Sequence, residues 1–295
     1  MSMSQLLLIF VRKFCVNRKL HCGSSVELAF NRYGDPDKDH QRIPLVICHG
    51  LLGHKQNWRS VAKTLHRRLR STIYTLDLRN HGESPWNDAM SYEDMSCDVV
   101  KFLETISKQF DIAKFHILGH SMGGRVAMRL AIEPSWQNLI DRLIIEDISP
   151  RTYGNQFTAS FRKYVKGMAA MDLRKSRKEL LKEFEFIVPD LAIRQFLLLN
   201  LVPSEVANES RWRCNLEAID KHLENILKFT LPSGSFNGAT LFCYGQNSDY
   251  VKSDDRNYIK SIFPNVTFEC ISDAGHWVHS EQPVAFMDAV CRFLQ

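Results

Sequence analysis

The sequence lacks a hydrophobic run long enough to cross a bilayer. Its longest uninterrupted apolar stretch covers residues 6–11, whereas a membrane-spanning helix needs about 20 apolar residues. Glycine and proline are also sparse, with 14 and 10 among 295 residues, which excludes collagen and disordered chains rich in these residues. Hydrophobic residues make up 44% of the chain and charged residues 24%. This composition is typical of a globular protein, and we predict no transmembrane segment.

The sequence also lacks paired cysteines. Its eight cysteines are scattered, and none forms a Cys-x-x-Cys pair or stands at zinc-site spacing from histidines. Such pairs and spacings mark zinc sites and the disulfide frameworks of small secreted domains. We therefore expect neither a structural metal nor a disulfide framework.

Acidic residues are absent from the first 26 positions, since Glu27 is the first acid in the chain. Four basic residues precede it, namely Arg12, Lys13, Arg18 and Lys19. The rest of the chain therefore carries 34 of the 38 basic residues against all 33 acids. A nucleic-acid-binding domain would show a clear basic excess. We predict no nucleic-acid partner, because nearly all of the +5 charge lies at the start of the chain.

Residues 1–24 have the composition of an organelle transit peptide. The segment is basic, free of acids, partly hydroxylated and able to form an amphipathic helix. A secretory signal would place its charges before the hydrophobic stretch, whereas here they follow it. The alternative interpretation is an uncleaved basic tail on a cytoplasmic protein.

The order of apolar runs predicts an α/β fold with a mostly parallel sheet. Short and nearly continuous apolar runs are typical of strands that are covered on both faces. Helix-compatible stretches such as 92–110 and 125–132 lie between most of them, and alternation of this kind indicates a doubly wound sheet. The predicted strands are residues 45–48, 73–78, 115–118, 143–145, 239–244 and 266–271.

Two segments depart from this alternation. Residues 25–33 alternate between polar and apolar, which predicts a half-buried strand, and the turn-rich residues 34–44 are expected to close a hairpin. Residues 151–231 show helical periodicity without a convincing strand. A stretch of this length is too long for an unstructured loop. We predict a core in two parts, 25–150 and 232–295, with 151–231 as a helical lid.

The candidate nucleophile is Ser121, in a Gly-x-Ser-x-Gly pattern at residues 119–123. The pentapeptide alone is a weak signal, but here an apolar strand runs directly into it and a helix follows. A serine at such a sharp turn is held out at the carboxyl edge of the sheet, where ligands bind in α/β folds. The helix is expected to begin near Met122 and to direct its positive dipole end at the site.

A serine needs a base, and the base needs an orienting acid. His276 follows the last predicted strand and is the candidate base, whereas His279 is expected to be structural. Asp147 and Asp249 each follow a strand between the serine and the histidine, so both satisfy the order serine, acid, histidine. Glu217 in the lid is a third candidate, and the residues alone leave this choice open.

The oxyanion hole and the acyl pocket have candidates in the same loops. Two backbone N–H groups must face the developing negative charge. Leu51, in the turn of residues 49–53, and Met122 are the candidate donors. Trp58 and Trp277 are hypothesised to line the acyl pocket, because they neighbour this turn and His276. Ordinary core packing of the two tryptophans is the alternative interpretation.

Together these motifs resemble those of α/β-hydrolases. The similarity rests on residues 49–53, 77–84, 119–124 and 273–279, and it covers nearly all of the chain after residue 24. Residues 147–150 and 212–216 further resemble a mitochondrial subgroup of this family and its bacterial esterase relatives. This resemblance implies an α/β-hydrolase fold with a helical lid inserted between core strands. It also favours Asp147 as the acid, a mitochondrial matrix location, and acyl or lipid esters, including diacylglycerols, as substrates.

The sequence therefore predicts a serine hydrolase that cleaves carboxylic esters through an acyl-enzyme intermediate. Its partner would be a small-molecule ester, and the mechanism requires neither a metal nor another cofactor. The alternative is a catalytically silent hydrolase-like protein that binds a ligand or partner without turnover, because a fold does not guarantee an activity.

Overall fold

The computed structural model describes residues 25–39, 42–206 and 208–295. The predicted transit peptide, residues 1–24, lies outside the described residues. Within these ranges no helix combines the length and the apolar character that a bilayer crossing requires.

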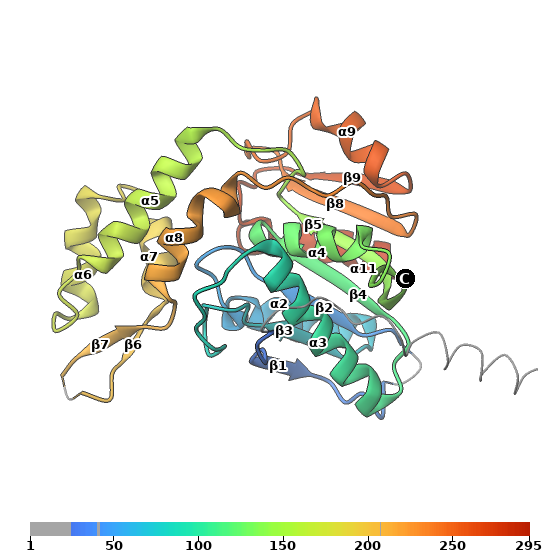
Figure 1. The fold of residues 1–295 in the computed structure, drawn as a ribbon, viewed down its shortest axis with the longest axis horizontal. Coiled ribbons are helices and arrows are strands. Elements are labelled where there is room, and N and C mark those ends of the chain that lie inside the picture. The colour runs from blue at the N-terminus through green and yellow to red at the C-terminus, as the bar shows by residue number, and fades with distance from the viewer. Residues whose placement is uncertain (1–24, 40–41, 207) are drawn as a thin grey trace, which may run out of the picture.

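A mostly parallel sheet forms the centre of the molecule (Figure 1), and this confirms the predicted fold class. The described residues contribute seven strands in the order β1, β3, β2, β4, β5, β8 and β9. Every neighbouring pair is parallel except β1 and β3. The strands are β1 (Phe30–Tyr33), β2 (Leu45–Cys48), β3 (Ile73–Leu76), β4 (Phe115–His120), β5 (Ile140–Glu146), β8 (Ala239–Gly245) and β9 (Val266–Ile271).

The first strand does not form the hairpin expected from residues 34–44. β1 instead pairs with β3 in antiparallel fashion, with Phe30 opposite Leu76 and Tyr33 opposite Ile73. Both edges of β2 are already occupied, one by β3 and the other by β4. The hairpin prediction was therefore wrong, because only the outer edge of β3 was free to accept β1.

Helices cover both faces of the sheet. On one face lie α2 (Arg59–Leu69) and α11 (Pro283–Leu294), and on the other lie α3 (Tyr92–Phe110), α4 (Met122–Ile132) and α9 (Asp255–Ile262). Because side chains alternate along a strand, Leu118 of β4 packs on the α2 and α11 side while Ile117 packs on the α3 and α4 side. This alternation decides which side chains at the strand ends point to each face of the sheet.

A helical insertion separates β5 from β8 and gathers to one side of the sheet (Figure 1). Its helices are α5 (Asn155–Ala169), α6 (Arg177–Glu183), α7 (Leu191–Leu198) and α8 (Leu216–Leu227). The insertion also holds a two-stranded antiparallel hairpin, β6 (Leu201–Pro203) with β7 (Ser210–Trp212). No strand was predicted in residues 151–231, because three-residue strands are too short to show an alternating pattern.

Both ends of this insertion are held by one buried side chain of α4. The guanidinium of Arg125 donates to the carbonyl oxygens of Ile226 (2.7 Å) and Leu227 (3.2 Å) at the end of α8. It also donates to the carbonyl oxygen of Arg151 (2.8 Å), where the insertion begins. Since Arg125 is 1% exposed, the insertion is tied to the helix that starts at the candidate nucleophile.

Candidate active site

Ser121 stands between β4 and α4 in a strained backbone conformation. Its φ of 52° and ψ of −116° lie outside the ordinary regions for a residue with a side chain. The Ser121 N–H donates to the carbonyl oxygen of Glu146 on the neighbouring strand (3.0 Å). A Cβ atom at Gly123 would lie 2.3 Å from the carbonyl oxygen of Cys48. Only glycine therefore lets α4 begin this close to the end of β2, and the tight turn presents Ser121 at the sheet edge.

His276 and Asp147 meet at the ends of β9 and β5. His276 Nδ1 lies 2.7 Å from Asp147 Oδ2. The Asp147 carboxylate is fully buried and also accepts hydrogen bonds from the Gly245 N–H (3.1 Å) and the Ser248 hydroxyl. Because an ionised carboxylate only accepts hydrogen bonds, His276 Nδ1 carries the proton here and leaves Nε2 free to act as a base.

Neighbouring residues bring the His276 ring to the same edge as Ser121. Tyr250 stacks on the His276 ring with centroids 3.8 Å apart, and Tyr250 and Ser121 line one cavity. His120 Nε2, next to the nucleophile in the chain, donates to the carbonyl oxygen of His276 (3.0 Å). Among the described residues no hydrogen bond joins Ser121 to the His276 ring, and in substrate-free enzymes such bonds are often long.

Of the three candidate acids, only Asp147 contacts His276. The Asp249 side chain is 81% exposed and forms a pair with Lys252 (3.5 Å). Glu217 is exposed in the first turn of α8. The loop that carries Asp249 still contributes to the site, because its Gly245 and Ser248 are the residues that donate to Asp147.

The turn of residues 49–53 lies beside the nucleophile. A Cβ atom at Gly50 would lie 3.2 Å from Ser121 Cβ. No hydrogen bond within the described ranges occupies the Leu51 N–H, and Met122, as the first residue of α4, has no intrahelical acceptor for its own N–H. Both predicted oxyanion donors therefore retain free N–H groups close to Ser121.

Two neutral histidines hold this turn in place. His49 Nδ1 donates to the Gly50 carbonyl oxygen (2.7 Å), and His49 Nε2 accepts from the Leu78 N–H (3.0 Å). His81 Nε2 accepts from the Leu52 N–H (3.1 Å), while its Nδ1 donates to the carbonyl oxygen of Arg79. Burial lowers the pKa of His49 to about 4 and that of His81 to about 3. Each ring needs one bare nitrogen, so protonation would break a bond to the turn.

The cavity at Ser121 is mainly apolar and aromatic. Apart from Arg125 its lining offers hydrocarbon, ring and hydroxyl groups from the core and from the insertion. The lining residues are Leu51, Tyr92, Ser121, Met122, Arg125, Ile148, Tyr153, Phe161, Ile226, Leu227 and Tyr250. The chemistry of this lining suits a nonpolar acyl chain, while the cavity in this structure is nearly closed, with a volume of about 10 Å³.

Neither predicted pocket tryptophan lines this cavity. Trp58 is 1% exposed and stacks on His279 with centroids 4.0 Å apart, on the face of the sheet covered by α2 and α11. Trp277 packs against Phe196 of α7 (5.5 Å between centroids). Trp58 ends the short 3-10 helix Lys55–Trp58, which leads into α2 and directs its ring into the core on that face. Trp58 is therefore a core residue and not part of the pocket.

Sequence reasoning missed Tyr250 and Ser248. Burial raises the pKa of Tyr250, so this side chain remains a neutral phenol against the His276 ring. The Tyr250 N–H donates to Ser248 Oγ (3.2 Å), which in turn donates to Asp147. Their position after a buried strand was the available signal, but neither a tyrosine nor a second serine stands out chemically beside the titratable Asp249 in the same loop.

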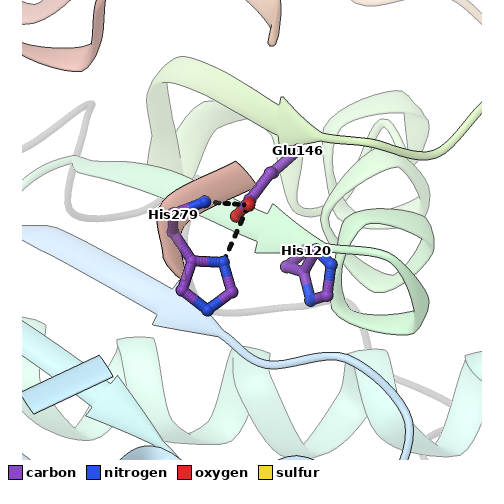
Figure 2. A group of neighbouring side chains, drawn as sticks. All are labelled: His120, Glu146 and His279. Carbon is purple, nitrogen blue, oxygen red and sulfur yellow. Dashed lines mark hydrogen bonds and ion pairs between the residues drawn. The ribbon is translucent and has the colours of Figure 1, made fainter. Parts of the chain in front are cut away.

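A second buried cluster lies directly beneath the site. His120, Glu146 and His279 offer ligand atoms within 4.8 Å of one another, and these are the residue types that bind transition metals (Figure 2). Hydrogen bonds already engage them, because Glu146 Oε1 accepts from His279 Nδ1 (2.7 Å) and His120 Nε2 donates to the His276 carbonyl oxygen. The arrangement is therefore explained without a metal ligand role.

Comparisons with known proteins agree with this fold. The family described as an alpha/beta hydrolase fold matches residues 43–283. The sn-1-specific diacylglycerol lipase ABHD11 of Danio rerio is 37% identical over 282 residues, covering 94% of this chain and 85% of that protein. Esterase YbfF of Escherichia coli is 31% identical over 256 residues, covering 86% of this chain and 94% of that protein.

Solved structures include a close match as well. A marine microorganism esterase superposes with a TM-score of 0.82 at 32% identity, covering 91% of this chain and all of that one. The family match spans well over half of the chain. The matches to the lipase and the esterase cover 85% and 94% of the length of those two proteins. The chain therefore belongs to the α/β-hydrolase family and is an esterase- or lipase-like hydrolase.

Proposed function

We propose that the chain cleaves carboxylic esters through an acyl-enzyme intermediate, with Ser121 as nucleophile, His276 as general base and Asp147 as the orienting acid. The observation that carries this proposal is the 2.7 Å contact between His276 Nδ1 and the buried Asp147 carboxylate. It lies beside a strained serine at the carboxyl edge of the sheet. This combination matches the roles that define serine hydrolases on unrelated folds.

Acylation begins when His276 Nε2 removes the Ser121 hydroxyl proton and Oγ attacks the ester carbonyl carbon. The carbonyl oxygen becomes negatively charged and accepts hydrogen bonds from the N–H groups of Leu51 and Met122. The buried Asp147 carboxylate stabilises the imidazolium that forms. The tetrahedral intermediate then collapses, and His276 gives its proton to the departing alcohol oxygen.

Deacylation uses the same groups with water as the nucleophile. His276 Nε2 removes a proton from water, the hydroxyl oxygen attacks the Ser121 acyl ester, and the two N–H groups again hold the oxyanion. Collapse of this second intermediate releases the carboxylic acid and returns the proton to Ser121. Each removal of an oxyanion donor from such sites lowers turnover by about 100- to 1,000-fold.

The substrate class we propose is an acyl or lipid ester, with diacylglycerol as the specific candidate. Two observations support it. The cavity at Ser121 is lined mainly by apolar and aromatic groups, and the similar protein from Danio rerio is a diacylglycerol lipase by name. We infer from the cavity that the acyl chain lies along the side chains of α5 and α8, where Phe161 and Ile226 contribute.

Ester hydrolysis by the full chain and by Ser121→Ala tests the proposal. We expect the wild-type chain to hydrolyse a panel of p-nitrophenyl esters of graded acyl length, and to release fatty acid from dispersed diacylglycerol. Ser121→Ala should remain folded and lose at least about 1,000-fold in turnover. Near-normal hydrolysis by this variant would refute the assignment, and activity confined to acetyl esters would refute the lipid substrate.

The competing function is a silent hydrolase-like binding protein, in which the same fold holds a ligand without turnover. A fluorophosphonate probe distinguishes the two, because it reacts only with an activated serine. We expect stoichiometric labelling of the wild-type chain. Absence of labelling, together with tight binding of an unreacted lipid, would favour the binding protein.

We also propose import into the mitochondrial matrix, based on the basic and acid-free residues 1–24. A fluorescent fusion of the full chain should enter mitochondria, whereas a fusion that lacks residues 1–24 should remain in the cytoplasm. Equal import of both fusions would contradict the leader hypothesis.

A further inference from the structure

Each residue of the proposed triad lies close in the sequence to one residue of the buried cluster of Figure 2. His120 directly precedes Ser121, Glu146 directly precedes Asp147, and His279 follows His276 by three residues. Neighbouring residues at a strand end point to opposite faces of the sheet. The cluster therefore lies on the α2 and α11 side, where Trp58 packs against both His120 and His279.

The cluster fixes the segment that carries the proposed base at two points. Glu146 Oε1 accepts from the His279 N–H (2.8 Å) and from His279 Nδ1 (2.7 Å). His120 Nε2 donates to the carbonyl oxygen of His276 (3.0 Å). Both anchors start from strand ends of the central sheet, since His120 ends β4 and Glu146 ends β5. The His276 ring is therefore positioned by these backbone and side-chain contacts of its segment as well as by its bond to Asp147.

Burial of these three polar side chains costs folding free energy. Glu146 is 0% exposed, His120 4% and His279 6%, and Glu146 Oε2 has no hydrogen-bond partner in the described part of the chain. A buried carboxylate with half its acceptors unused is expensive, and an apolar side chain of the same volume is often as stable. Core stability alone therefore does not account for a carboxylate at this position.

Burial and the two neighbouring histidines also lower the pKa of His120 well below its usual value. The ring is neutral at physiological pH, with its one proton on Nε2 facing the His276 carbonyl oxygen. A neutral ring gives a bond of fixed direction at the residue next to Ser121. The geometry of the anchor thus does not change over the pH range in which a histidine base works.

We propose that Glu146, with His279 and His120, is a positioning residue that sets the orientation of His276 toward Ser121. This inference rests on the proposed function and adds residues that never touch the substrate. Displacement of a base by about 1 Å can lower the rate of a step by about 100-fold while leaving substrate binding intact. Loss of the Glu146 anchor should therefore lower kcat and leave KM nearly unchanged.

The test compares Glu146→Leu, which removes the acceptor, with Glu146→Gln, which keeps an oxygen at nearly the same place. His279→Phe preserves the stacking on Trp58 but removes the donor, and it serves if Glu146→Leu fails to fold. His116→Gln is the matched control. His116 is 8% exposed on the same face of β4, four residues and about 13 Å from His120.

The full-chain variants are assayed for kcat and KM on a p-nitrophenyl ester, normalised to the fraction that a fluorophosphonate titrates. We expect Glu146→Leu and His279→Phe to lower kcat by about 10- to 100-fold with KM within twofold. Glu146→Gln should recover most of the lost kcat, and His116→Gln should retain wild-type kcat and KM even if its unfolding midpoint falls.

A spectroscopic readout separates this inference from the proposed function. The low-field proton resonance of His276 Nδ1, bonded to Asp147, should shift or broaden in Glu146→Leu and remain in His116→Gln. An unchanged resonance with kcat within twofold would overturn the positioning role while leaving the hydrolase intact. A wild-type chain without turnover would overturn both. One metal ion per chain that is lost in Glu146→Gln would also overturn it, because the cluster would then serve as a metal site.

Discussion

The two neutral histidines beside the turn of residues 49–53 predict that acid destabilises the fold. The ordinary histidine pKa is 6.5, whereas burial lowers the pKa of His49 to about 4 and that of His81 to about 3. In the unfolded chain both rings therefore bind a proton near pH 6.5, while in the folded chain they remain neutral to lower pH. Lowering the pH through this window favours the unfolded state, and stability is greatest above it.

The magnitude follows from the difference in pKa. At pH 5 each ring is about 1.5 pH units below its unfolded pKa and still mostly neutral in the folded chain, which corresponds to about 2 kcal/mol. Together the two rings should lower the free energy of unfolding by about 4 kcal/mol between pH 8 and pH 5. This is a large fraction of the 5 to 15 kcal/mol that stabilises a typical protein.

Urea unfolding of the wild-type chain and of His81→Gln at pH 8 and pH 5 measures this effect. A glutamine does not titrate, and its side-chain oxygen can accept the Leu52 N–H that His81 Nε2 accepts. We expect the pH-dependent loss of stability to be about 2 kcal/mol smaller in His81→Gln. His222→Gln, on α8 away from this turn, controls for the substitution. Equal losses in wild type and His81→Gln, within about 0.5 kcal/mol, would refute the reasoning.

Three further predictions follow from the same contacts. Asp147→Asn should lower kcat by about 1,000- to 10,000-fold because the His276 tautomer is no longer fixed; a defect equal to that of Asp249→Asn would contradict the choice of acid. Gly123→Ala should impair both stability and turnover, because its Cβ would lie 2.3 Å from the Cys48 carbonyl oxygen; a thermal midpoint equal to wild type would count against the close approach. Arg125→Met leaves the carbonyl oxygens of Leu227 and Arg151 without their donor, each worth about 1 to 3 kcal/mol when buried, while that of Ile226 keeps the Tyr92 hydroxyl; limited proteolysis within residues 151–231 should therefore accelerate. Unchanged cleavage rates would show that Arg125 does not hold the insertion.

The fold could be predicted because its signals are local. Continuous apolar runs such as 115–118 and a helix at 92–110 are visible in sequence order, and the Gly-x-Ser-x-Gly turn at 119–123 requires its glycines. The pairing of β1 with β3 could not be predicted, because it depends on which edge remains free after β2 and β4 have paired. The short β6 and β7 hairpin carries too few residues for a periodic signal.

The nucleophile and the base could be proposed from the sequence, but the choice of acid and of pocket residues depends on three-dimensional packing. Asp147 and Asp249 both follow strands, but of the two only Asp147 has a positive φ, and its carboxylate contacts Gly245 and His276. Trp58 lies near the turn in sequence yet packs on the opposite face. Tyr250 has no chemical signature in the sequence, and its role depends on the stacking that the fold creates.

The central claim is that Ser121 is an activated nucleophile. Mass spectrometry of the full chain after reaction with a fluorophosphonate tests it most directly, because Ser248 lies in the same site and bonds to Asp147 without being at the turn. We predict one adduct per chain, located on Ser121 and abolished in Ser121→Ala. An adduct on Ser248, or a folded wild-type chain that forms no adduct, would contradict the account.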